Sequence, residues 1–117
     1  MPAFLRVATD DQGHARFSDW DPAVRPEHPE PHELGASTPL PASAAVVICA
    51  PAGGGHPQQP EARRQLAVML SGTCTITATG ETRSFGPGDV LLVEDTTGSG
   101  HSSTTSDGST ALLASLE

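Results

Sequence analysis

From residue 63 onward, the sequence is a series of short strand-favouring runs separated by tight turns. In the run at 73–79, threonine alternates with Cys74, Ile76 and Ala78, which is the period of a strand with one wet and one dry face. The runs are "RRQLAVML" (63–70), "TCTITAT" (73–79), "TRSF" (82–85), "VLLVE" (90–94), "HSSTT" (101–105) and "TALLASL" (110–116). No segment shows a convincing helical period, so the pattern predicts an antiparallel all-β barrel or sandwich.

The first part of the chain adds strands and an irregular arm. Residues 3–8 and 14–20 predict two strands around a turn at 10–13, 44–50 predicts a buried strand, and 51–62 predicts a flexible loop. Between the predicted strands at 14–20 and 44–50, residues 21–43 hold six of the eleven prolines. These prolines exclude a helix or a central strand of a sheet in this segment. We expect residues 1–43 to form N-terminal strands and a proline-rich arm of the same domain, and residues 44–117 to form its barrel.

The amino-acid composition excludes several kinds of binding and catalysis. The 117 residues predict one domain, and the net charge of −8 with few aromatic residues argues against binding nucleic acid. All six basic residues are arginine, so no lysine can form a Schiff base. Tyrosine is also absent, which leaves His, Asp, Glu or Cys for proton transfer.

Cysteine use and the N-terminus point to the cytoplasm. Cys49 and Cys74 lie in apolar runs and are expected to be buried free thiols. The N-terminal "MPAFLRVATDD" lacks the apolar core of a signal peptide, and no segment approaches the ~20 apolar residues of a membrane span. The bias toward Ala, Gly, Pro and Arg is typical of a GC-rich bacterial genome.

Residues 88–101 resemble the second of the two motifs that define cupins. Gly88 is followed after seven residues by a Thr-Thr-Gly at 96–98, and His101 follows two residues later. The glycines and the histidine have the cupin spacing, while Thr96 replaces the usual proline and Thr105 the usual asparagine.

The first cupin motif is matched less well. Gly72 fits its final glycine, which places Gln65 where a glutamate ligand normally stands. Gln59 and Glu61 then fall at the two histidine positions, and His56 lies three residues early. The stretch from Arg63 to His101 is similar to a group of small single-domain bacterial cupins, so the resemblance implies a double-stranded β-helix, or jelly-roll, barrel.

Typical cupins bind iron, manganese, zinc or nickel with three histidines and a glutamate inside the barrel. Here only His101 is in register, and the neutral amide of Gln65 is a poor substitute for a carboxylate. His56 or Glu61 would join a metal site if the glycine-rich loop folded inward. The preferred interpretation is a barrel without a metal, in which His101 is a solitary acid–base group.

Strand alternation orders the other candidate residues. If Gln65 points inward, then Ala67 and Met69 line the barrel, and Arg63 lies at its rim to bind an anionic group or to pair with a carboxylate. Of Glu94 and Asp95, one faces the pocket and the other faces outward, where it caps a turn or pairs with arginine; the sequence does not decide which.

Two other segments contain patterns that can indicate ligand binding. His28 and His32 in the arm have the spacing of helical metal ligands, but the prolines at 29 and 31 forbid the helix. The arm could instead close the barrel mouth with His32 or Trp20, cover a partner, or stay exposed. The segment "PAGGGH" (51–56) lacks the Lys-Ser/Thr of a phosphate-binding loop.

These features lead to three functional hypotheses. The preferred one is a metal-independent isomerase, cyclase or lyase of bacterial secondary metabolism. His101 would be its base or acid, Glu94 or Asp95 would assist, and Arg63 and Gln65 would hold a polar or anionic small molecule. The alternatives are a metal-dependent oxygenase or lyase that uses His101, Gln65, His56 and Glu61, and a non-catalytic ligand-binding barrel. The family resemblance also implies that a homodimer can form.

Overall fold

The computed structural model describes residues 3–26 and 34–117, and these residues form strands and loops without a helix. The strands are β1 (Phe4–Thr9), β2 (Ala15–Asp19), β3 (Arg25–Pro26), β4 (Gly35–Ala36), β5 (Ala42–Ala50), β6 (Gly55–Gln59), β7 (Gln65–Gly72), β8 (Cys74–Ala78), β9 (Glu81–Phe85), β10 (Val90–Glu94), β11 (His101–Thr104) and β12 (Ser109–Leu116). Nothing in the described residues is a helix long and apolar enough to cross a membrane.

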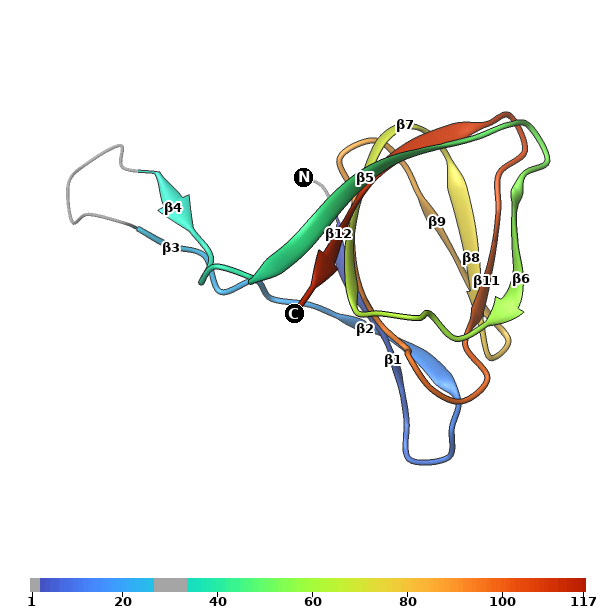
Figure 1. Cartoon of the computed structure of the whole chain (residues 1–117), viewed down its shortest axis with the longest axis horizontal. Helices are drawn as coiled ribbons and strands as arrows, with labels where there is room; N and C mark the ends of the chain where they lie inside the picture. The colour runs from blue at the N-terminus through green and yellow to red at the C-terminus, as the bar shows by residue number, and fades with distance from the viewer. Residues whose placement is uncertain (1–2, 27–33) are drawn as a thin grey trace.

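Two sheets face each other and enclose the interior (Figure 1). The larger sheet has the order β2-β1-β10-β7-β12-β5, and the smaller one has the order β6-β11-β8-β9. Within them β1 runs parallel to β10, and the other pairs are antiparallel. The predicted all-β jelly roll is confirmed, and its larger sheet includes β1 and β2 from residues 1–43.

The core lies between the sheets and is built by the alternation read from the sequence. Leu91 and Val93 of β10 point inward, as do Ile76 and Ala78 of β8. Phe85 of β9 is among the largest fully buried side chains of the described residues. Burying each large aliphatic side chain contributes about 1.5–3 kcal/mol to the stability of the fold. The apolar residues therefore fix which face of each strand points inward, and only that face can carry a site inside the barrel.

The turn before β10 is held by one carboxylate. Asp89 accepts hydrogen bonds from the backbone N–H of Ala3 and of Gly86, both at 2.9 Å. These two bonds, the one from Ala3 first, hold the pKa of Asp89 below its usual value. Gly88 beside it has φ 87°, a conformation that favours glycine. The turn therefore fastens the start of the chain to the start of β10.

The prediction of a buried strand at 44–50 is half wrong: β5 is a strand, but it is exposed. It lies at the edge of the larger sheet and pairs only with β12 among the described strands. Val46, Val47 and Ile48 are 51%, 61% and 46% exposed. The predicted burial of Cys49 is wrong for the same reason, whereas Cys74 is half-buried; both thiols are free.

The prediction of a flexible loop at 51–62 is also wrong in its second half. Residues 55–59 form β6, which pairs antiparallel with β11. Gly55 makes this pairing possible, because a Cβ there would lie 2.0 Å from the carbonyl oxygen of Ser103. Proline and glycine in this segment mark an edge strand with a close backbone approach, and that strand brings His56 into the barrel.

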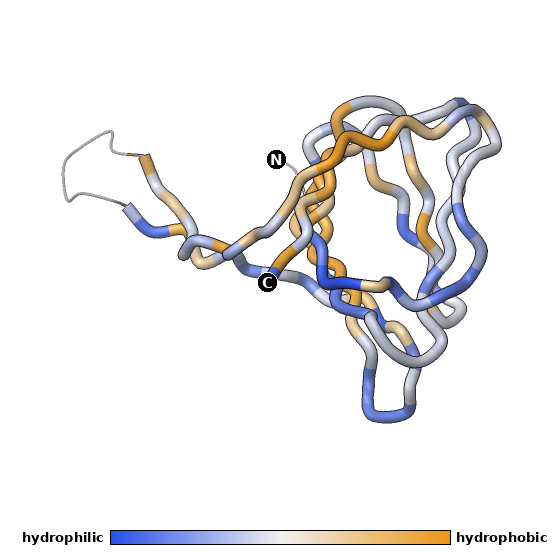
Figure 2. Tube along the Cα trace, viewed as in Figure 1, coloured by the Kyte–Doolittle hydropathy of each residue, from blue (hydrophilic) through white to orange (hydrophobic). Residues whose placement is uncertain are grey.

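The described parts of the arm, residues 21–26 and 34–41, project from the barrel (Figure 1). β3 and β4 pair as two-residue strands, and the apolar residues that precede them, Val24 and Leu34, are 50% and 77% exposed. Figure 2 shows hydrophobic stretches of the trace along the larger sheet. Trp20 packs edge-on against Phe4, with ring centroids 6.2 Å apart, and does not line the pocket described below. His28 and His32 lie outside the described residues.

Candidate functional site

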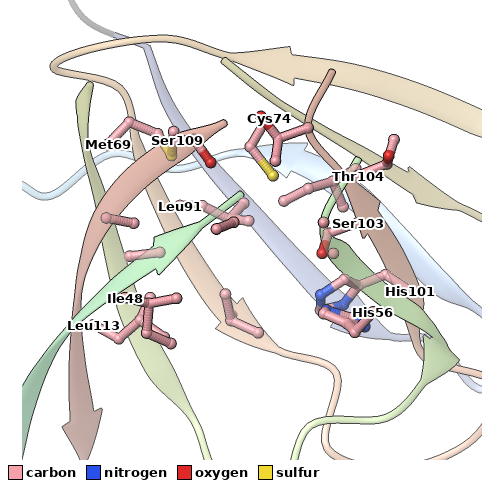
Figure 3. Close-up of a pocket in the computed structure, with 18 of the residues that line it drawn as sticks. Ile48, His56, Met69, Cys74, Leu91, His101, Ser103, Thr104, Ser109 and Leu113 are labelled. Carbon is pink, nitrogen blue, oxygen red and sulfur yellow. The ribbon is translucent and has the colours of Figure 1, made fainter. Parts of the chain in front are cut away.

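A cavity of about 530 Å³ lies between the two sheets. Its wall is mostly aliphatic, and the two imidazoles and the carboxylate that line it lie at one end. His56 and His101 lie together at that end, whereas Met69, Cys74 and Ser109 lie away from them (Figure 3). Burial raises the pKa of the Cys74 thiol, and a backbone hydrogen bond from Thr104 only partly offsets this effect.

His101 opens β11 and is only 3% exposed. Two glycines of the preceding loop, Gly98 and Gly100, have φ of 71° and 69°. A Cβ on Gly100 would lie 2.0 Å from the backbone carbonyl of Gln59, so glycine lets this loop pass against the end of β6. The cupin-like spacing of these glycines therefore reflects a steric requirement that aims His101 into the cavity.

Asp95 is the carboxylate that faces inward. It follows Leu91 and Val93 on the inner face, is fully buried, and places Oδ2 2.6 Å from Nδ1 of His101. When the carboxylate of Asp95 accepts this hydrogen bond, Nδ1 of His101 is the donor and Nε2 of the neutral ring keeps its lone pair. Asp95 thus fixes both the ring orientation and the tautomer of His101.

Glu94 faces outward and does not share the site. It forms ion pairs with Arg6 on β1 and with Arg64, whose Nε lies 2.8 Å from Oε2. Partial burial would raise the pKa of Glu94, but the hydrogen bonds and charges of Arg6 and Arg64 outweigh it and hold the pKa below its usual value. The sequence left open which of Glu94 and Asp95 faces the pocket; in the structure it is Asp95, and Glu94 is not positioned for catalysis.

His56 reaches the site from β6, opposite Ser103 of β11. Its Nδ1 lies 2.8 Å from the carbonyl oxygen of Pro57, and since a carbonyl can only accept, this nitrogen is the donor. The Nε2 lone pair of His56 is therefore free to face the cavity. The rings of His56 and His101 meet edge-on with centroids 5.0 Å apart.

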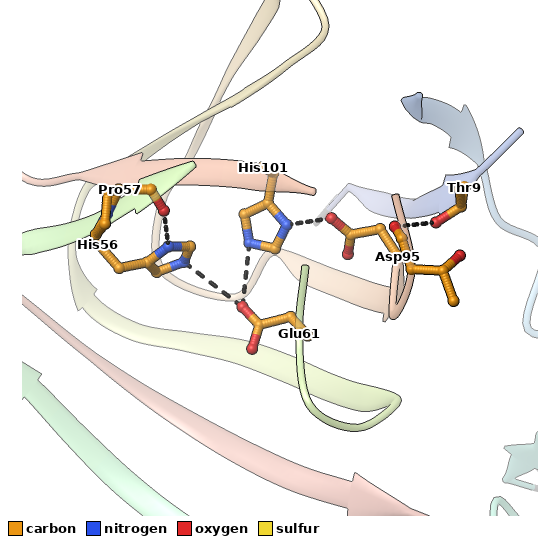
Figure 4. Close-up of polar contacts among 7 residues, drawn as sticks. Thr9, His56, Pro57, Glu61, Asp95 and His101 are labelled. Atoms are coloured by element: carbon orange, nitrogen blue, oxygen red, sulfur yellow. Dashed lines mark hydrogen bonds and ion pairs between the residues drawn. The ribbon is translucent and has the colours of Figure 1, made fainter. Parts of the chain in front are cut away.

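Glu61 completes the group (Figure 4). One of its oxygens, Oε1, lies 3.5 Å from Nε2 of His56 and 3.4 Å from Nε2 of His101. Its backbone N–H also donates to the carbonyl of Asp95 at 3.0 Å, which ties the segment after β6 to the end of β10. One ligand atom from each of the three residues lies within 4.8 Å of the other two.

The expectation of a solitary His101 did not include the two residues that the structure places beside it, His56 and Glu61. It rested on the register of the first motif, which placed Gln59 and Glu61, rather than His56, at the two histidine positions. The β6–β11 pairing brings His56 in regardless, because its register shifts between His101 and Ser103.

The donor set fits a divalent metal. Two imidazoles and one carboxylate are ligands that zinc, iron, manganese and nickel accept. Both imidazoles present an Nε2 lone pair, and each Nδ1 faces an acceptor oxygen, as in metal sites whose histidines are oriented by a second layer of hydrogen bonds. The same three groups, without a metal, could also move a proton.

The remaining predicted residues divide between the cavity and the surface. Gln65, Ala67 and Met69 line the cavity along the inner face of β7. Arg63 is exposed and is not among the described residues that line it. The arginine that pairs with Glu94 is the neighbouring Arg64.

Sequence reasoning missed several cavity residues for one reason. Ile48, Leu113, Ser103 and Ser109 come from β5, β11 and β12, and each lies in a run with no chemical signature. Their inward placement follows from cross-strand pairing, which joins Ile48 to Ala111 and, on the next strand pair, joins Ala111 to Met69. Strand alternation alone could have divided each run into two faces without saying which one is inner.

Solved structures support the fold. Over 89% of this chain and 93% of the other, the structure is similar to an RmlC-like cupin from Shewanella frigidimarina NCIMB 400, with a TM-score of 0.54 and 15% identity. Over 97% and 81%, it is similar to the cupin domain of Schizosaccharomyces pombe Cnp3, with a TM-score of 0.52 and 16% identity. At these identities the likeness shows the fold alone.

A third similar structure is a cupin protein from Bacteroides fragilis, with a TM-score of 0.49 and 20% identity, where the match covers 62% of this chain and 64% of the other. No curated protein sequence matches. Residues 40–111 match the EutQ-like cupin domain family, and this segment contains β5 to β11, the residues that line the cavity except Leu113, and all three residues of the His56–Glu61–His101 group. The chain therefore belongs to the EutQ-like cupin domain family.

Proposed function

We propose that this cupin is a small-molecule enzyme whose reactive centre is a divalent metal site formed by His56, Glu61 and His101. The observation that carries the proposal is that Nε2 of both histidines faces the same carboxylate oxygen of Glu61, at 3.5 and 3.4 Å. Lone pairs that converge on one point are what a cation requires.

Each residue has a defined task in this proposal. Asp95 and the carbonyl of Pro57 hold the two imidazoles in the tautomer that presents Nε2. Glu61 contributes negative charge, and the aliphatic wall excludes water from the bound substrate. The metal, when bound, would supply Lewis-acid polarisation of a substrate oxygen. Oxygenation would require a redox-active metal such as iron, whereas lyase chemistry would need only a Lewis acid.

Metal titration tests the proposal directly. Protein purified without a histidine tag should bind one equivalent of zinc, iron, manganese or nickel in calorimetry, and elemental analysis should find the metal after desalting. His56→Ala should lose this binding, whereas His14→Ala, which alters a histidine outside the group, should keep it. If the unaltered protein binds none of these ions stoichiometrically, the metal site is refuted.

A second candidate is proton transfer without a metal, as an isomerase, cyclase or lyase. It is favoured by the chain of contacts from Asp95 through His101 to Glu61, in which a buried carboxylate would stabilise the imidazolium formed when His101 takes a proton. Here His101 is the base or acid and Glu61 relays the proton. If turnover of an identified substrate persists after exhaustive chelation and falls in His101→Ala, this candidate replaces the first.

A further inference from the structure

We infer that the ligand of this cavity carries one polar head at the His56–Glu61–His101 end and an uncharged, apolar body. The inference rests on the proposed function and deepens it by naming the chemical class of the substrate. It differs from the expectation of a polar or anionic substrate held by Arg63 and Gln65, because only Gln65 of these two lines the cavity.

The body of the ligand would meet hydrocarbon. Between its two ends the cavity is walled by aliphatic side chains from both sheets and by the thioether of Met69; they include Ile48, Ala67, Ile76, Leu91, Val93 and Leu113. Outside the histidine end, the side-chain polar groups of the lining are hydroxyls, the thiols and the amide of Gln65, all without charge. Such a wall stabilises apolar surface and offers a charged group no counter-ion.

The arginines of the chain lie outside the cavity. The sequence has no lysine, and residues 27–33 contain no arginine, so the described residues include all six arginines. None of the six is among the residues that line the cavity. Arg6 and Arg64 pair with Glu94, Arg16 pairs with Asp10, Arg83 pairs with Glu81, and Arg25 and Arg63 are exposed.

The charge that is present has the opposite sign and lies at one end. Glu61 lines the cavity, and Asp95 lies directly behind His101. The chain as a whole carries −8, so an anionic ligand is repelled at a distance as well as in the site. A phosphate or second carboxylate on the ligand body would therefore lose its water without gaining a partner.

Two hydroxamic acids with the same head test this inference. Octanohydroxamic acid has an eight-carbon chain that ends in a methyl group, and the monohydroxamic acid of suberic acid has the same length but ends in a carboxylate. Their affinities should be measured by calorimetry with zinc-loaded and zinc-free protein. We expect the carboxylate to weaken binding by about tenfold or more in both forms, because it is buried without a counter-ion.

A pair of variants gives the matched control. Ser109→Arg places a cation at the end of the cavity away from the histidines and should reverse the preference in favour of the suberic acid derivative. Thr110→Arg adds the same charge on the next residue of β12, which does not line the cavity, and should leave the preference unchanged. Circular dichroism should confirm that both variants are folded.

The outcomes separate the two proposals. Equal or tighter binding of the suberic acid derivative by the unaltered protein, or no binding of octanohydroxamic acid, overturns the inference. A clear preference for octanohydroxamic acid in a protein that binds no metal would refute the metal centre and leave the apolar-body inference standing.

Discussion

Oδ2 of Asp95 lies 2.6 Å from Nδ1 of His101, and both side chains are almost completely buried, with 0% and 4% of their surface exposed. A short contact between a carboxylate and an imidazole in such a place fixes the ring. The lone pair on the other ring nitrogen then points into the cavity. The pair links the end of β10 to the start of β11, so the loop between them is held at both ends.

The first prediction concerns this contact. Asp95→Asn should weaken zinc binding by about 10- to 100-fold, because the amide holds the Nδ1–H tautomer of His101 less firmly than a carboxylate does. Competition against a fluorescent zinc chelator measures the change. Glu94→Gln alters the neighbouring residue, which faces outward, and should leave zinc affinity within about twofold. Equal losses in the two variants would show that the effect is general destabilisation.

The second prediction uses the pKa of Glu94. This pKa is lower in the folded state than the reference value of 4.5, so the ionised pair with Arg6 and Arg64 adds stability above pH 4.5 that is lost as the pH falls below it. Glu94→Gln should therefore cost about 1 kcal/mol at pH 7, a small value because both arginines are largely solvated. Urea unfolding from pH 7 to pH 3 should show the difference shrinking; a constant difference would contradict this assignment.

The third prediction separates two effects of glycine. Gly100→Ala should destabilise the protein by about 3 kcal/mol or more, because its Cβ would collide with the backbone at Gln59. Gly80 has a similar φ of 79° with nothing within 4 Å, so Gly80→Ala should cost only about 1 kcal/mol. Thermal unfolding measures both. Only Gly100→Ala should also lose metal binding, since it separates β6 from β11.

The fourth prediction concerns the two thiols. Cys49 is exposed, while Cys74 is half-buried in the cavity wall and burial raises its pKa. Because the thiolate is the reactive form, iodoacetamide should modify Cys49 before Cys74 at pH 8. Mass spectrometry of peptides from a time course measures the order. Faster modification of Cys74 would mean that the cavity is more open than its lining indicates.

The fold could be predicted from the sequence because the patterns that indicate strands and turns each lie within a few neighbouring residues. The alternation at 73–79 and the turn glycines around 86–88 set strand positions without reference to the rest of the chain. Burial was harder to predict, as β5 shows: its apolar run is typical of a central strand, yet it lies at the edge. Position within a sheet depends on which strands pair, and no local pattern encodes this.

The candidate site was predictable only in part. His101 could be found because the glycines that aim it are its sequence neighbours. His56 and Glu61 could be named but not placed, since their approach depends on the pairing of β6 with β11 and on its shift in register. Counting residues along a motif assumes an unbroken register, and the irregular pairing of these two strands breaks that assumption.

The length of β10 determines which of the two carboxylates, Glu94 or Asp95, faces the cavity. Glu94, the last residue of β10, and Asp95, which follows it directly, point to opposite faces because side chains alternate along an extended chain. Inserting or deleting a single residue within β10 would exchange the two carboxylates, pulling the arginine partner inward and turning the histidine partner out. Conservative substitutions along this strand should therefore be tolerated far better than any change in its length.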